Sequence, residues 1–295
     1  MTKSSKPSIS VLICNYNKES FILNTLDSVL AQTYKPSQIV VVDDASTDNS
    51  VSLIFEYAQR HAEIDFVQLK NNIGPSNARN IGIKYVKNSL IGFIDSDDLW
   101  KDKKLEKQVE LLQATDSDLI YNEYSTFDDH GHINYDYPKP FLRGDNITKK
   151  LIEGNFIMGS SSAVLCKFEK VVEAGGFDGA LQDIANSFAE DWDLWLRLSK
   201  ICKFDYVNEP LTQIYTGGSY YKAPEDGAII ASRFKAHLWV RNKHWDDPQL
   251  RQVIIEKTIE EWKSINPKLT PQLIDDVLGW VGNLNQEIAR EFAAC

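Results

Sequence analysis

The chain has 295 residues, of which 43% are hydrophobic and 25% charged; this balance is typical of a globular protein and excludes wholesale disorder. Its 32 basic against 42 acidic side chains give a formal net charge of −10, so we expect no nucleic-acid partner bound through phosphate attraction. No apolar run reaches the roughly 20 residues of a transmembrane helix, and segment 1–7 lacks a signal-peptide hydrophobic region. Because the four cysteines are widely spaced, we expect a reduced, cytoplasmic protein.

The first hundred residues predict strands and helices in regular alternation. Buried strands are predicted at 8–14, 38–42, 65–69 and 90–94, and helices at 21–30, 50–57 and 76–86. This alternation predicts an α/β fold with a parallel sheet covered on both faces. Ligands of such sheets bind beyond the carboxyl ends of the strands, where segments 15–17, 43–44 and 95–98 bring Asn and Asp side chains together.

The rest of the chain is less regular. Strands are predicted at 118–125 and 160–166, and helices at 169–174 and 190–199. From about residue 224 helices replace the alternation, and Thr270 followed by Pro271 is a typical helix start. A helical stripe of apolar residues follows at Leu273, Val277, Trp280, Leu284 and Ile288.

Four tryptophans of the C-terminal segment admit two interpretations: Trp239, Trp245, Trp262 and Trp280. They pack either against the preceding domain or against a second subunit, which would form a homodimer. Alternatively, they make peripheral contact with the inner face of a plasma membrane that carries a lipid-linked acceptor. The segment is not strongly basic, which weakens the membrane interpretation.

The strongest chemical signal is the run Asp95-Ser96-Asp97-Asp98 directly after a predicted buried strand. A lone DxD more often marks a turn, but three carboxylates within four residues repel one another unless a cation or hydrogen-bond donors compensate. Leu99 and the residue after it fit neither an EF-hand nor a DxDxT phosphatase, and no glycine-rich phosphate loop follows the first strand. The run therefore predicts Mg²⁺ or Mn²⁺ bridging the protein to a diphosphate.

Four motifs in order resemble the nucleotide-binding half of family 2 glycosyltransferases: VLICNYNKESFILNTLDSVLAQTY, IVVVDDASTDNS, NNIGPSNARNIGI and GFIDSDDLW. A fifth piece, GGFDGAL followed by Glu190-Asp191-Trp192, resembles the family's acceptor-side segment and catalytic acid motif. The resemblance implies a GT-A fold with a mostly parallel sheet flanked by helices. It implies a glycosyltransferase domain at 1–222, with a nucleotide-sugar half at about 8–112 and an acceptor half at about 113–222. Residues 223–295 are then a helical extension.

The resemblance also implies the residues that bind the nucleotide. Tyr16 should lie against the nucleobase, while Asn15 and Asn17 shape its loop. Cys14 belongs to the same loop and stands where a proline or threonine is usual in the family. Asp44, rather than Asp43 beside it, should accept a hydrogen bond from the base, which fits the imide N–H of uracil and favours a UDP-sugar.

Further donor contacts are implied nearer the diphosphate. Asp95 should contact the ribose or the sugar, with Ser96 beside it, while Asp97 binds the metal and Asp98 shares that task. Arg79 either contacts donor phosphate or pairs with the carboxylates at 43–44; otherwise it is a surface helix residue. The histidine that supplements the metal site in many members is replaced here by Gly217-Gly218, so a third protein ligand is not identified.

Asp191 is the residue implied to do the remaining chemistry. An acid at a helix start is often only a cap or a dipole partner. Inverting transfer, however, needs one general base to remove the proton of the acceptor hydroxyl, and the motif order assigns that role to Asp191. The metal would neutralise charge on the departing nucleoside diphosphate.

The sequence thus predicts a metal-dependent, inverting, non-processive glycosyltransferase. It would move one sugar from a nucleotide sugar to a glycan or lipid-linked acceptor in bacterial surface polysaccharide synthesis. Two alternatives are a nucleotidyltransferase, which also combines a parallel sheet with a metal-bound DxD, and a non-catalytic nucleotide-sugar-binding subunit.

Overall fold

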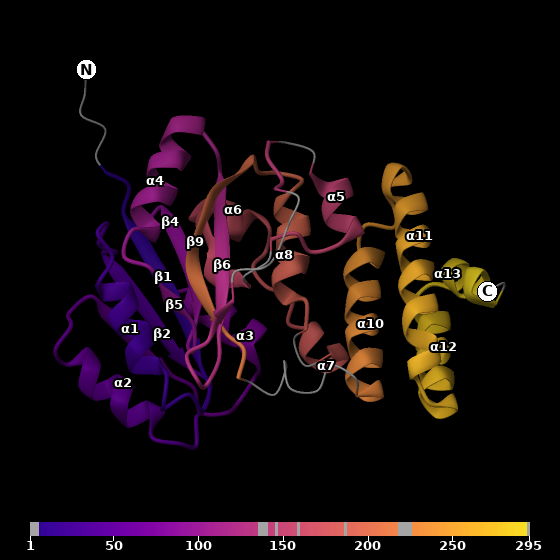
Figure 1. The fold of residues 1–295 in the computed structure, drawn as a ribbon, viewed down its shortest axis with the longest axis horizontal. Coiled ribbons are helices and arrows are strands. Elements are labelled where there is room, and N and C mark those ends of the chain that lie inside the picture. The colour runs from indigo at the N-terminus through magenta and orange to yellow at the C-terminus, as the bar shows by residue number, and fades with distance from the viewer. Residues whose placement is uncertain are drawn as a thin grey trace.

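The protein is described by a computed structural model that covers residues 6–134, 141–144, 147–157, 160–185, 188–217 and 226–293. Its centre is a mixed sheet of nine strands with helices on both faces, and a group of helices extends from one end of it (Figure 1). The strands of the main path run in the order β3-β2-β1-β4-β8-β6-β9-β5, and β7 pairs with β6.

The N-terminal part of the sheet is the parallel unit that the sequence predicts. Its strands are β1 (Ile9–Asn15), β2 (Gln38–Asp43), β3 (Ile64–Gln68) and β4 (Leu90–Asp95). The connecting helices are α1 (Ile22–Leu30), α2 (Ser50–Ala58) and α3 (Pro75–Ile83). Since all four strands run the same way, the loops that follow β1, β2 and β4 lie together at one edge.

The second part of the sheet is mixed. Its strands are β5 (Leu99–Trp100), β6 (Leu119–Phe127), β7 (Ile133–Asn134), β8 (Val164–Lys167) and β9 (Phe204–Tyr215). β8 runs antiparallel to both β4 and β6, whereas β9 runs parallel to β6. The residues before β8 form a short 3₁₀ helix, η1 (Ser161–Ala163), so the strand predicted at 160–166 starts later than expected.

The two faces of the sheet carry different cores. Ile9, Val11 and Ile13 of β1 pack in one cluster with α1, α2 and α4 (Lys104–Thr115), while Leu12 points into the other. This alternation buries both sides of the strand, as the apolar run at 8–14 predicts. The second cluster contains α3 and four further helices of the domain: α5 (Thr148–Glu153), α6 (Phe168–Glu173), α7 (Leu181–Ala185) and α8 (Glu190–Leu198).

The C-terminal helices share that second core. They are α10 (Gly227–Asn242), α11 (Pro248–Ile265), η2 (Asn266–Lys268), α12 (Pro271–Leu284) and α13 (Gln286–Ala293). α10 contacts α7 and α11 contacts α5, while the ring of Trp262 stacks on Phe292. The tail thus packs on the domain (Figure 1). The boundary predicted at 222–223 falls outside the described residues, so that division stays a prediction.

Two details of the helical segment differ from or complete the sequence predictions. Thr270 caps α12 as expected, its side chain accepting a hydrogen bond from the N–H of Leu273. The apolar stripe predicted from Leu273 to Ile288, however, does not lie on one helix. α12 ends at Leu284, and Ile288 belongs to the next helix, α13. Within the described ranges, no helix is both long and apolar enough to cross a bilayer.

Candidate active site

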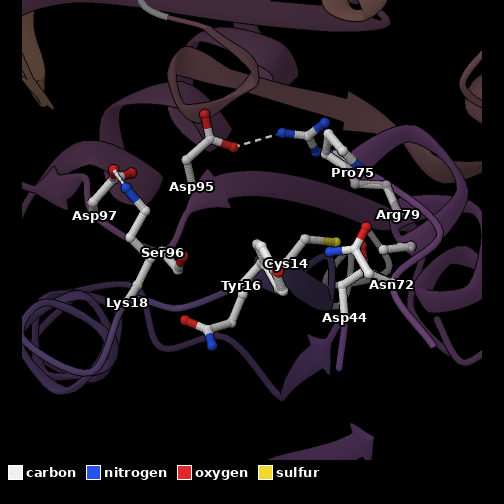
Figure 2. A pocket seen from close by; sticks show the side chains of 12 residues that line it. Cys14, Tyr16, Lys18, Asp44, Asn72, Pro75, Arg79, Asp95, Ser96 and Asp97 are labelled. Atoms are coloured by element: carbon white, nitrogen blue, oxygen red, sulfur yellow. Dashed lines mark hydrogen bonds and ion pairs between the residues drawn. The ribbon is translucent and has the colours of Figure 1, made fainter. Parts of the chain in front are cut away.

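A cavity of about 270 Å³ opens at the carboxyl ends of β1, β2 and β4 (Figure 2). Eight of its lining residues are ones that the sequence singles out: Cys14, Asn15, Tyr16, Asp44, Arg79, Asp95, Ser96 and Asp97. Tyr16 is 45% exposed, which leaves its ring available to a planar ligand. The cavity lies where ligands of open α/β sheets bind.

The loops after β1 and β2 are joined by polar contacts. The buried Asp43 accepts hydrogen bonds from Asn15 Nδ2 at 2.8 Å and from the backbone N–H of Ser46 at 2.8 Å. Asn17 does not line the cavity; its Oδ1 accepts from the N–H of Thr47 at 2.8 Å. Asp43 and Asn17 therefore shape the loops, and Asp44 remains the carboxylate that faces the cavity.

Asp44 also fixes the segment that leads into α3. Its Oδ1 accepts from the N–H of Ile73 at 2.8 Å and its Oδ2 from the N–H of Gly74 at 2.9 Å. Gly74 has a φ of +82°, a conformation that glycine adopts without strain. Burial raises the pKa of Asp44 from its ordinary value, although these two backbone donors act against the rise. Each carboxylate oxygen keeps a second lone pair for a ligand.

The acidic run after β4 divides between the cavity and the interior. Asp98 is 2% exposed, and its carboxylate accepts from Ser162 Oγ at 2.6 Å and from the N–H of Tyr215 at 3.0 Å. Asp97 instead faces the cavity, where Lys18 Nζ lies 2.5 Å from its Oδ2 (Figure 2). Asp98 thus points into the interior and does not line the cavity, so its share in binding a metal stays a prediction.

Arg79 connects the cavity to helix α8. Its Nη2 lies 2.7 Å from Asp95 Oδ1 and its Nη1 lies 2.9 Å from Glu190 Oε1, so the predicted pairing with the carboxylates at 43–44 is wrong. Arg79 is only 7% exposed, so it is not a surface residue of the helix. α3 holds Arg79 there because Gly82 lets the helix approach β1; a Cβ on Gly82 would lie 2.3 Å from Leu12 Cδ1.

Asp191 lies one residue beyond this bridge, in the first turn of α8. Its Oδ1 accepts from the N–H of Trp192 at 2.6 Å, and burial raises the pKa of Asp191. Burial likewise raises the pKa of Glu190 from 4.5 to about 7; Arg79 opposes this rise and Asp191 adds to it. The two acids form a half-buried, interacting pair next to the donor-side carboxylate Asp95.

Backbone strain gathers around these loops. Outside glycine, the described residues with positive φ are Asn17 (52°), Ala45 (61°), Asp116 (51°), Ser160 (53°) and Ala189 (63°). Ala45 follows Asp44 directly, and Ala189 precedes the acid pair. Alanine rarely adopts this conformation, and strained backbone often accompanies functional sites.

The carboxylates of the cavity fit one kind of divalent-cation site. Asp95 and Asp97 both line the cavity, and Mg²⁺ is commonly held by one or two carboxylates together with substrate phosphates. Among the described residues, no group of three or more His, Cys, Asp or Glu side chains could hold a metal by itself, in this cavity or outside it. The residues present therefore fit a cation that is shared with a bound diphosphate and do not fit an all-protein metal site.

Four residues of the cavity were not predicted from the sequence: Lys18, Asn72, Pro75 and Ala78. Lys18 carries the clearest chemistry, since it places an ammonium group beside Asp97. Its position directly after the Asn15–Asn17 loop could have indicated that Lys18 belongs to the site. Pro75 stands four residues before Arg79 on α3 and Ala78 one residue before it, and the i, i+4 spacing of Pro75 and Arg79 could have indicated a shared helix face.

A sequence model described as "Glycosyl transferase family 2" matches residues 10–173, more than half of the chain. The chain belongs to glycosyl transferase family 2. The matched range contains the cavity loops and stops before α8. This membership favours glycosyl transfer over the nucleotidyltransferase alternative.

Curated relatives agree with the family. TuaG of Bacillus subtilis, which carries a provisional assignment to teichuronic acid biosynthesis, is 35% identical over 120 residues, covering 41% of this chain and 48% of TuaG. An uncharacterized glycosyltransferase of Methanocaldococcus jannaschii is 26% identical over 247 residues, covering 81% of this chain and 80% of that protein. The chain thus spans about half the length of TuaG and most of the archaeal protein.

Solved structures share the fold. TarS residues 1–349 of S. aureus in complex with UDP-GlcNAc gives a TM-score of 0.72 at 17% identity, covering 95% of this chain and 81% of that one. The mannosyltransferase PcManGT of Pyrobaculum calidifontis in complex with GDP-Man and Mn²⁺ gives 0.62 at 17% identity, covering 99% and 79%. These similarities establish the GT-A architecture, including the C-terminal helices, and at this identity nothing finer.

Proposed function

We propose that this glycosyltransferase is an inverting enzyme that transfers one sugar from a UDP-sugar to a hydroxyl of a glycan or lipid-linked acceptor. The observation that carries the proposal is the Arg79 bridge, which joins the donor-side Asp95 to Glu190, next to Asp191. Inverting displacement needs a base on the acceptor side and charge stabilisation on the leaving-group side. The bridge brings the helix that carries Asp191, the proposed base, next to Asp95, which would help to hold the cation that stabilises the leaving group.

On the donor side, Tyr16 offers an exposed ring for the base and Asp44 an acceptor for the imide N–H of uracil. Asp95 and Asp97 would hold Mg²⁺ or Mn²⁺, which when bound neutralises charge on the diphosphate. Lys18 pairs with Asp97 at 2.5 Å and lies in the same cavity. When the donor binds, the Lys18 ammonium group would exchange its ion pair with Asp97 for one with a phosphate oxygen.

On the acceptor side, Asp191 would accept the proton of the attacking hydroxyl. Helix N-termini favour negative charge, which acts against the rise in the pKa of Asp191 that desolvation causes. Glu190 would bind Arg79, so that Asp191 acts as the base and Glu190 holds the helix in place. The wider role in surface-glycan synthesis is suggested by TuaG, and localisation at the inner face of the plasma membrane belongs to the same proposal.

A thermal-shift screen tests the proposal. The full chain is heated with UDP-glucose, UDP-galactose, UDP-GlcNAc or GDP-mannose, each with and without Mn²⁺. A bound donor stabilises by mass action, about 2.7 kcal/mol at 100 times its Kd, so a UDP-sugar should raise the melting temperature most, and more with Mn²⁺. No shift with any nucleotide sugar, or an equal shift with UDP-sugars and GDP-mannose, would contradict the donor assignment.

A further inference from the structure

The helical extension touches the acid-bearing helix α8 directly. α10 ends at Asn242, and Lys243 after it reaches α8 with its side chain. Figure 1 shows α10 between α8 and the outer helices. The contacts fall on Trp192 and Asp193, which are the two residues that follow Asp191.

The first contact is a buried ion pair. Lys243 Nζ lies 2.6 Å from Oδ1 of Asp193, a residue with no exposed surface. The other oxygen, Oδ2, accepts from Arg197 Nε at 2.9 Å and Nη2 at 2.6 Å. A buried carboxylate that loses a cation is costly. The orientation of the first turn of α8 is therefore tied to the end of α10.

Lys243 also binds the acceptor-side segment. Its Nζ lies 2.5 Å from Asp178 Oδ2, which accepts in addition from Trp239 Nε1 of α10 at 2.9 Å. The ring of Phe177, next in the chain, lies 5.2 Å from the Arg79 guanidinium. One ammonium group thus joins α8 to the segment that supports the Arg79 bridge.

The second contact clamps Trp192. Arg241, 4% exposed, places its guanidinium 5.3 Å from the centre of the Trp192 ring and donates from Nε to the carbonyl of Ile152 at 3.2 Å. Its Nη1 lies 2.6 Å from Glu261 Oε2 of α11. The indole N–H of Trp192 donates to the carbonyl of Leu151 at 2.7 Å. The side chain next to Asp191 is therefore held between α5 and α10.

We propose that Lys243 and Arg241 are positioning residues that hold the acid pair of α8 at the donor cavity, so that the C-terminal helices belong to the catalytic unit. The inference rests on the proposed function, in which Asp191 is the base. Neither residue lines the donor cavity. Their loss should therefore slow turnover without weakening donor binding, because misplacing a catalytic group by about 1 Å can cost up to 10²-fold in rate.

The test compares Lys243→Met with the matched variant Lys167→Met. Lys167 forms a 2.8 Å ion pair with Asp118, and its side chain is 29% exposed against 27% for Lys243. UDP release is followed with the UDP-sugar that the wild type turns over fastest. We expect Lys243→Met to lower kcat by roughly 10-fold or more with donor KM within about twofold. Lys167→Met should leave both constants near wild type, and Lys243→Arg should recover most of kcat.

Two further readouts keep the inference falsifiable. Hydrogen exchange of the backbone amides 189–193 should rise in Lys243→Met and not in Lys167→Met. If Lys243→Met does not fold, Arg241→Lys, which keeps the charge but loses the planar contact with Trp192, should show the same loss confined to kcat. Equal kcat and equal exchange in Lys243→Met and Lys167→Met would overturn the inference.

Asp191→Asn, measured in parallel, separates this inference from the proposed function. An inactive Asp191→Asn together with a normal Lys243→Met overturns the positioning role and leaves the base in place. An active Asp191→Asn removes the base assignment. A kcat-specific loss in Lys243→Met would in that case still support positioning of α8, with Glu190 as the acid that is positioned.

Discussion

The strand-end loops and helix α8 each supply half of the site, and they are stabilised in different ways. The loops are held by contacts within the nucleotide half, such as Asp44 with the backbone of Ile73, 29 residues away. α8 is held by residues far along the chain: Arg79 meets Glu190 across 111 residues, and Lys243 meets Asp193 across 50. A short motif can therefore specify the donor site, whereas the base depends on the completed fold.

The largest expected effect comes from breaking the α8 half alone. Asp191→Asn keeps the size of the side chain and its bond to the N–H of Trp192 but removes its basicity. Loss of a general base costs about 10²–10⁴-fold in rate, so sugar transfer should fall by that range while the Kd for UDP stays unchanged. Transfer within a few-fold of wild type would return Asp191 to a structural role.

Breaking the loop half should affect binding first. Asp44→Ala removes the acceptor for the base and also frees the N–H groups of Ile73 and Gly74. UDP binding measured by calorimetry should weaken by about 1–3 kcal/mol, the scale of a hydrogen bond to a charged group. A wild type that binds UDP, GDP and ADP equally well would count against base recognition by Asp44.

Glu190 should also make the stability of the protein depend on pH. The folded pKa of Glu190 is about 7 against 4.5 ordinarily, so between these values the folded state holds a proton that the unfolded state releases. Its contribution to stability is complete below about pH 4.5 and is lost as pH rises through 7. Urea unfolding of Glu190→Gln should lack this decrease of stability with pH. The free energy of unfolding of the variant should therefore rise relative to that of wild type between about pH 4.5 and 7. Parallel stability curves for the two proteins would be evidence against the raised pKa.

The smallest effect sharpens the account of the loops. Ala45 has a φ of 61°, a conformation that costs an L-residue about 1–2 kcal/mol, while glycine costs roughly 0.5–1 kcal/mol through the unfolded chain. Ala45→Gly should therefore raise the unfolding free energy by about 0.5–1 kcal/mol. A decrease in melting temperature would show that the methyl group stabilises the loop through contacts.

Features fixed by neighbouring residues could be predicted from the sequence, whereas features that depend on distant contacts could not. The parallel strands were predictable from apolar runs that end directly in polar motifs, and the eight cavity residues from the family resemblance that those motifs carry. β9 was missed because Glu209-Pro210 interrupts its pattern, and pairing with β6 and β5 makes it a strand. The inward turn of Asp98 depends on Ser162 and Tyr215, 64 and 117 residues downstream, which no local pattern reveals.

The most direct test of the central claim is calorimetric titration of wild type and Asp97→Ala with UDP, in Mn²⁺ and in its absence. If the cavity at the strand ends binds a nucleoside diphosphate together with a cation at Asp97, Mn²⁺ should tighten UDP binding to wild type at least 10-fold, about 1.4 kcal/mol. Asp97→Ala should lose this gain while staying folded. Equal Mn²⁺-dependent affinity in the two proteins would contradict this claim.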